Sequence, residues 1–148
     1  HDSLTNGWFT GDTFGLSYRE FDTENGAFIL PTTTPIQFDP EALKASVRKL
    51  ATSKPDCMYL THYGRVEGVQ SLAIKMIEAV DVLVGFAELY NNDDQRNAKI
   101  VSAMSDWLIE GIKAHGVSLD DSAVMNLLHA DIVLNTQGIE FWLDHRKT

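Results

Sequence analysis

The sequence has few cysteines, few basic residues and no long apolar run, and each shortage excludes a class of protein. Cys57 is the single cysteine among 148 residues, which excludes an intrachain disulfide framework and a cysteine-rich zinc site. Twelve Lys and Arg against 21 Asp and Glu give a net charge of −9, and such acidity disfavours a nucleic-acid partner. No apolar run approaches the roughly 20 residues that cross a bilayer, and no basic-then-apolar leader is present. We therefore expect a cytoplasmic protein without a membrane partner.

Proline is absent after Pro55, and this divides the chain in two. Residues 1–64 are rich in Gly, Thr and aromatic residues with short apolar runs, whereas residues 65–148 follow a helical period. The pattern predicts an α+β protein, with strands, a long loop and a helix over 1–64 and a three-helix region over 65–148 packed on them.

The first part contains signals for two strands, a helix and a long loop. Asn6-Gly7 is a hairpin-turn pair, and the aromatic run after it predicts a strand ending near Gly11. A loop with a short hairpin is expected over 13–38. Asp-Pro-Glu then opens a helix over 39–53, because Asp caps and Pro fits the first helical position. A buried strand is expected over 57–60.

The second part predicts three helices separated by polar or glycine breaks. An apolar stripe indicates a helix from about Val66 to Tyr90, and a second helix follows the polar segment 91–94 and ends near His115. Ser118, with an aspartate three residues on, is expected to cap the third helix. The stripe of the first helix would also suit a homodimer seam, but packing against the chain's own helices is preferred.

Two short motifs follow the predicted strands: Thr-Gly-Asp-Thr at 10–13 and Thr-His-Tyr-Gly at 61–64. Asp12 and His62 thereby stand at the ends of stiff elements, and a carboxylate with an imidazole suits zinc or iron. If the fold is as expected, the two side chains lie at the same edge of a sheet. An ordinary turn and a structural histidine are the alternative interpretations, because a catalytic metal site normally uses three or more protein ligands.

Taken together, these motifs resemble the second half of a metallo-β-lactamase superfamily hydrolase, and more narrowly the bacterial glyoxalase-II-like metallohydrolases. The similarity lies in the order and spacing of four segments: 8–15, 30–40, 59–64 and 131–138. It implies an αββα sandwich with a dinuclear metal site at one edge. Residues 1–64 would form part of that αββα domain, its second half, followed by the helical region over 65–148 packed on it.

The resemblance implies metal-binding roles for two residues. Asp12 matches the aspartate that bridges two divalent ions, most simply zinc, with iron or manganese as alternatives, and His62 matches the last histidine ligand. The family's His-x-His-x-Asp-His motif does not occur in the sequence. We therefore expect a C-terminal portion of a longer enzyme that is inactive by itself.

The implied activity is hydrolysis of a small ester, thioester or lactone by a hydroxide that the two metal ions share. Only 49 residues separate Asp12 from His62, too few for the insertion that nucleic-acid-processing members carry at this point. Four further residues are candidates for the pocket wall or for contacts to the metal ligands: Thr13, Tyr18, Thr33 and Tyr63.

Two other functions stay open at this point. A di-iron oxidoreductase of the same superfamily would use Asp12 and His62 as well, and a non-catalytic helical interaction module would keep them only as relics. Asp131 and Asn135, four residues apart on one helix face, are expected to form a structural network rather than to reach the pocket. Cys57 is expected to be an inert core residue.

Overall fold

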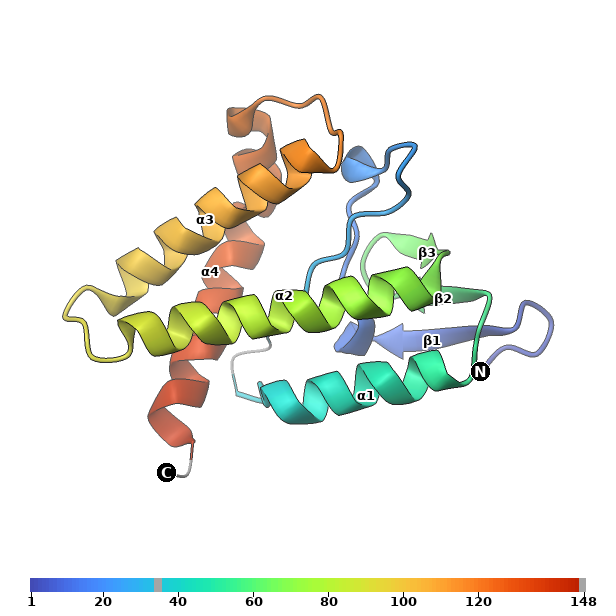
Figure 1. The fold of residues 1–148 in the computed structure, drawn as a ribbon, viewed down its shortest axis with the longest axis horizontal. Coiled ribbons are helices and arrows are strands. Elements are labelled where there is room, and N and C mark those ends of the chain that lie inside the picture. The colour runs from blue at the N-terminus through green and yellow to red at the C-terminus, as the bar shows by residue number, and fades with distance from the viewer. Residues whose placement is uncertain (34–35, 147–148) are drawn as a thin grey trace.

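The computed structural model describes residues 1–33 and 36–146 and has an α+β fold (Figure 1). Three strands form one sheet in the order β1-β2-β3: β1 (Gly7–Gly11), β2 (Cys57–Leu60) and β3 (Gly64–Val66). β1 and β2 are parallel, and β2 and β3 are antiparallel. The predicted fold class is confirmed, whereas half of an αββα sandwich stays a proposal.

Over the residues that the structure describes, four α-helices and two short 3-10 turns accompany the sheet. The helices are α1 (Pro40–Thr52), α2 (Val69–Tyr90), α3 (Arg96–Ala114) and α4 (Asp121–His145), and the turns are η1 (Asp12–Phe14) and η2 (Arg19–Phe21). The helix predicted over 39–53 is confirmed with its cap, since the Asp39 carboxylate accepts a hydrogen bond from the Ala42 N–H at 2.9 Å. Within the described ranges, none of these helices combines the length and apolarity that crossing a bilayer requires.

Three boundaries differ from the sequence-based expectation. Val66 belongs to β3 instead of opening α2, because it pairs with Met58 of β2. Asp120, and not Ser118, caps α4, and its carboxylate accepts from the Ala123 N–H at 2.8 Å. The hairpin turn ends one residue early, so that Asn6 has the positive φ of 46° and the following glycine already begins β1. Each difference results from strand pairing or capping geometry, which cannot be predicted from the periodicity of apolar residues.

Helix α2 runs from the sheet to the α3–α4 pair and connects two apolar clusters (Figure 1). Near its start, Met76 packs in a cluster with residues of α1 and the sheet, including Met58. Toward its end, Leu83 packs with α3 and α4 through Met104 and Leu128. The buried stripe confirms that α2 packs against the chain's own elements. The domain boundary at 64/65 stays a prediction, although both clusters draw residues from both sides of it.

The face of the sheet opposite α1 and α2 carries exposed aromatic surface. Phe9 and Tyr59 are partners in the parallel register and stack with their ring centroids 4.7 Å apart. Phe9 is 70% exposed. This face of the sheet therefore leaves a large aromatic side chain exposed.

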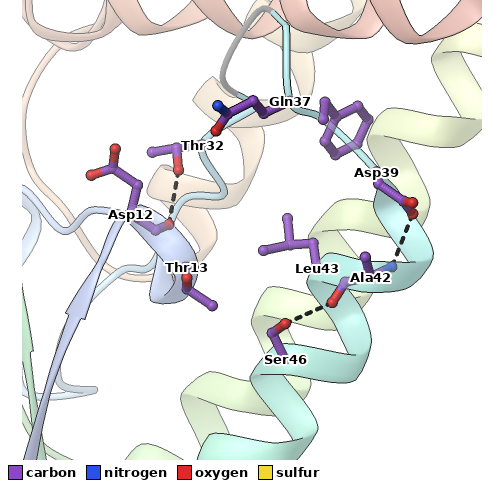
Figure 2. Close-up of a pocket in the computed structure, with 9 residues that line it drawn as sticks. Asp12, Thr13, Thr32, Gln37, Asp39, Ala42, Leu43 and Ser46 are labelled. Carbon is purple, nitrogen blue, oxygen red and sulfur yellow. Dashed lines mark hydrogen bonds between the residues drawn. The ribbon is translucent and has the colours of Figure 1, made fainter.

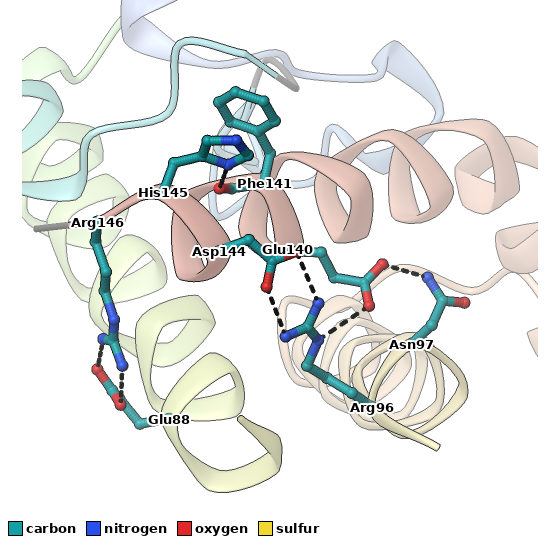
Figure 3. A network of polar contacts seen from close by, with 8 residues as sticks. All are labelled: Glu88, Arg96, Asn97, Glu140, Phe141, Asp144, His145 and Arg146. Carbon is teal, nitrogen blue, oxygen red and sulfur yellow. Dashed lines mark hydrogen bonds and ion pairs between the residues drawn. The ribbon is translucent and has the colours of Figure 1, made fainter. Parts of the chain in front are cut away.

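Charged pairs join the last turns of α4 to α2 and α3 (Figure 3). Arg96 of α3 contacts Glu140 at 3.2 Å and Asp144 at 3.0 Å. Arg146, just after α4, pairs with Glu88 of α2 and lowers the pKa of that carboxyl. These surface pairs orient the end of α4, while the apolar cluster between the helices supplies most of the stability.

Helix α4 also lies very close to the long loop before α1. A Cβ atom on Gly138 would lie 1.9 Å from the Thr33 carbonyl oxygen, so a glycine is required where the backbones meet. The loop contains the expected short hairpin, closed by hydrogen bonds between Thr23 and Gly26. Thr34 and Pro35, which belong to the segment that carries the family resemblance, lie outside the described residues.

Replacing Gly138 by Ala tests this contact. We expect Gly138→Ala to lower the free energy of unfolding by about 1–3 kcal/mol, because the loop or the helix must shift to admit a methyl group. Gly85→Ala in α2 is the matched control, since a Cβ there meets nothing within 4 Å. It should stabilise the protein by about 0.5–1 kcal/mol through helix propensity. Equal effects in urea denaturation would contradict the close approach.

Candidate functional site

Asp12 and His62 meet at one edge of the sheet. β1 ends at Gly11 and β2 at Leu60, and because the two strands are parallel neighbours, the loops that follow them are adjacent. The Asp12 Oδ1 and His62 Nε2 atoms are 3.7 Å apart, and each side chain is about half exposed, at 50% and 53%. The expected proximity is confirmed, and it brings together residues separated by a helix and a long loop.

The backbone around this pair has conformations that ordinary residues rarely adopt. Gly11 has φ 56°, and the register of β1 against β2 shifts between Phe9 and Gly11, just before Asp12. Tyr63 has φ 73° although it is not a glycine. Such strain is concentrated at functional sites in proteins and persists only where the surroundings hold it.

Arg19 holds the loop that carries His62. Its Nε donates to the Tyr63 carbonyl at 2.7 Å, and its Nη2 donates to the Arg65 carbonyl at 2.7 Å. Nη1 contacts Asp22 at 3.0 Å. On the other side, the Thr32 hydroxyl donates to the Asp12 carbonyl at 2.9 Å (Figure 2). Neither Arg19 nor Thr32 was predicted to support the site, because both contacts join distant parts of the chain through backbone carbonyls.

A cavity of about 460 Å³ adjoins the pair and lies between the sheet edge and α4. We call it the α4 cavity. Its lining includes Asp12, His62 and three of the four predicted pocket residues: Tyr18, Thr33 and Tyr63. The fourth, Thr13, lines a separate cavity of about 380 Å³ on the other side of Asp12, next to α1 (Figure 2).

Within the α4 cavity, Tyr18 and Asp131 form a hydrogen-bonded pair. The Tyr18 hydroxyl donates to Asp131 Oδ2 at 2.6 Å and contacts the Leu127 carbonyl at 3.1 Å. Burial and the neighbouring carboxylate raise the pKa of Tyr18 well above its usual value. The Tyr18 ring stacks on Tyr63, with centroids 4.3 Å apart.

Asn135 fastens the loop to α4 on the same wall. Its Oδ1 accepts from the Thr33 N–H at 2.8 Å, and its Nδ2 donates to the Pro31 carbonyl at 3.0 Å. The predicted structural network is therefore confirmed for both Asp131 and Asn135. Both residues also line the α4 cavity, so the expectation that they would not reach the pocket is wrong.

The metal roles of Asp12 and His62 stay predictions. Over residues 1–33 and 36–146, no group of three or more His, Cys, Asp or Glu side chains is arranged to hold a metal ion. Comparison with protein-family models, with curated proteins and with solved structures gives no match.

The Tyr18–Asp131 hydrogen bond can be measured through stability. Tyr18→Phe removes a donor from a partly buried carboxylate and should lower the free energy of unfolding by about 1.5–3 kcal/mol at pH 7. Tyr90→Phe is the matched control for loss of a phenol hydroxyl elsewhere and should have a smaller effect. Urea denaturation of the three proteins provides the comparison.

The same variants should differ in their dependence on pH. The folded state raises the pKa of Tyr18, so its contribution to stability is fully present below the unfolded value of about 10 and is lost as the pH rises above it. The deficit of Tyr18→Phe should therefore shrink in alkaline solution. A deficit that is unchanged up to pH 11 would contradict a raised pKa.

Proposed function

We propose that this chain supplies Asp12 and His62 as ligands to the dinuclear metal centre of a hydrolase, of the glyoxalase-II-like group in the metallo-β-lactamase superfamily. The observation that carries the proposal is the 3.7 Å distance between a carboxylate oxygen and an imidazole nitrogen at the ends of two parallel strands. The order of Asp12 before His62, with the segment 30–40 between them, is also the order that the resemblance implies.

The donor atoms fit a metal ion. Two donor atoms bound at about 2.1 Å to a tetrahedral zinc ion lie about 3.4 Å from each other. This separation is close to the observed distance between Asp12 Oδ1 and His62 Nε2. Both side chains are half exposed, so a small rotation suffices to bring them onto one ion. The proposal requires further ligands from outside the residues described, because Asp12 and His62 are only two.

Divalent ions at such a centre would lower the pKa of a water molecule and polarise a carbonyl group. Asp12, held by Thr32 through its backbone, would orient this centre, and its acceptor oxygens would direct the proton of the attacking water. His62 would bind as a neutral imidazole, on a loop that Arg19 holds through two backbone carbonyls.

The substrate we propose is a small ester, thioester or lactone. The α4 cavity, at about 460 Å³, has the size of a site for a small organic molecule and adjoins both ligands. Zinc is the simplest occupant, with iron or manganese as alternatives. A cytoplasmic location fits the single cysteine and stays part of the proposal.

The experiment is to express the full-length product of the gene, measure its bound metals by mass spectrometry and assay a panel of esters, thioesters and lactones. Asp12→Asn and His62→Ala should each reduce bound metal and lower kcat/KM by more than about 100-fold. Even residues that only contact a metal ligand cost about 10–100-fold when replaced.

Two exposed residues provide matched controls. Asp94→Asn and His129→Ala remove the same kinds of donor from the surface of the helical region and should leave metal content and activity unchanged.

Two bound irons with redox activity but no hydrolysis would favour the oxidoreductase. A full-length protein that binds no metal would favour the interaction module.

A further inference from the structure

We propose that the α4 cavity selects a substrate whose tail is apolar and carries no negative charge, either neutral or cationic. This inference rests on the proposed function for the role of the cavity, and it concerns the part of the substrate that does not react. It is carried by the walls of the cavity and by the signs of the charges around it.

Apolar and aromatic side chains form the accessible wall. Tyr63 is 46% exposed and is supported from behind by its stacking on Tyr18. Leu134 of α4 is 50% exposed although it is a large apolar residue. Both side chains line the cavity, so an apolar substrate tail would bury apolar surface that is otherwise exposed to solvent.

The charged side chains of the wall are acidic. Asp131 stands on α4, and the described lining residues include no Lys or Arg. Asp12, at the sheet edge, is not counted here, because the metal ions it is proposed to bind would balance its charge. The Asp131 carboxylate accepts a hydrogen bond from the Tyr18 hydroxyl, and the Tyr18 ring stacks on Tyr63. All three residues line the cavity. Paired carboxylate and aromatic groups attract a cationic group and repel an anion.

The guanidinium of Arg19, near the cavity, already has partners. Arg19 lies beside the Tyr63 loop, but its guanidinium donates to the carbonyls of Tyr63 and Arg65 and contacts the Asp22 carboxylate. Moving Arg19 to bind an anionic tail would leave two backbone carbonyls without this donor. Away from the proposed metal centre, the described lining residues therefore provide no Lys or Arg counter-ion for a carboxylate-bearing or phosphate-bearing tail.

The first test measures binding, so that it does not depend on turnover. Three probes of similar size are titrated into the metal-loaded, full-length protein and followed by amide NMR shifts: benzyl alcohol, benzyltrimethylammonium and benzenesulfonate. Sulfonate is chosen because it is a weak metal ligand. The alcohol and the cation should bind at least about tenfold more tightly than the sulfonate, with shifts at Tyr18, Tyr63 and Leu134.

The second test introduces a positive charge at the rim of the cavity. Leu134→Lys should bring the affinity for benzenesulfonate to that of benzyl alcohol or above, because it places an ammonium group in the cavity. Leu89→Lys on α2, at a leucine that is 70% exposed, is the matched control and should leave the order of affinities unchanged. The same reversal is expected in kcat/KM for phenyl esters with anionic and neutral tails.

The outcomes separate this inference from the proposed function. Hydrolysis together with sulfonate binding as tight as that of the alcohol would overturn the inference and leave the hydrolase intact. Selective binding that Leu134→Lys reverses, without metal or hydrolysis, would support a cavity selective for non-anionic groups and overturn the hydrolase. Sulfonate affinity that Leu134→Lys leaves unchanged would overturn the inference in either case.

Discussion

The candidate site depends on the parallel pairing of β1 with β2. Parallel neighbours end at the same edge, so the residues that follow them meet there even though a helix and a long loop lie between them in sequence. Asp12 and His62 are 3.7 Å apart for this reason. An antiparallel pairing of the same two strands would place them at opposite ends of the sheet. The apolar contact of α1 and α2 with the sheet therefore supports the site indirectly, by holding the two strands in register.

The helical region completes the site rather than merely covering the sheet. α4 supplies one wall of the cavity through Asp131, Leu134 and Asn135, and its Gly138 allows the loop before α1 to approach. Asn135 joins that loop to the helix by hydrogen bonds at both ends of its amide. A ligand beside Asp12 and His62 would thus contact α4 residues that lie 119–123 positions from Asp12 and 69–73 positions from His62 along the chain.

Local patterns accounted for much of the fold. The capped start of α1, the strands that end before Asp12 and His62 and the apolar stripe of α2 each follow from propensity, capping and periodicity. β3 was missed because its three residues become a strand only by pairing with β2. Asp120 was missed as the cap because two acidic residues and a serine compete near the start of α4. The role of Arg19 was missed because its partners are backbone carbonyls, which every residue carries and which no sequence pattern distinguishes.

The sequence by itself determined which residues end the strands, which faces of the helices are apolar and which chemistry Asp12 and His62 can offer. These are local properties, since side-chain type and backbone preference act within a few residues. The tertiary structure decided the distance between Asp12 and His62, the cavity beside them and the stacking of Tyr18 on Tyr63. These three features depend on strand pairing and helix packing, in which many weak contacts between distant segments act together. The spacing of residues along the chain does not indicate such contacts.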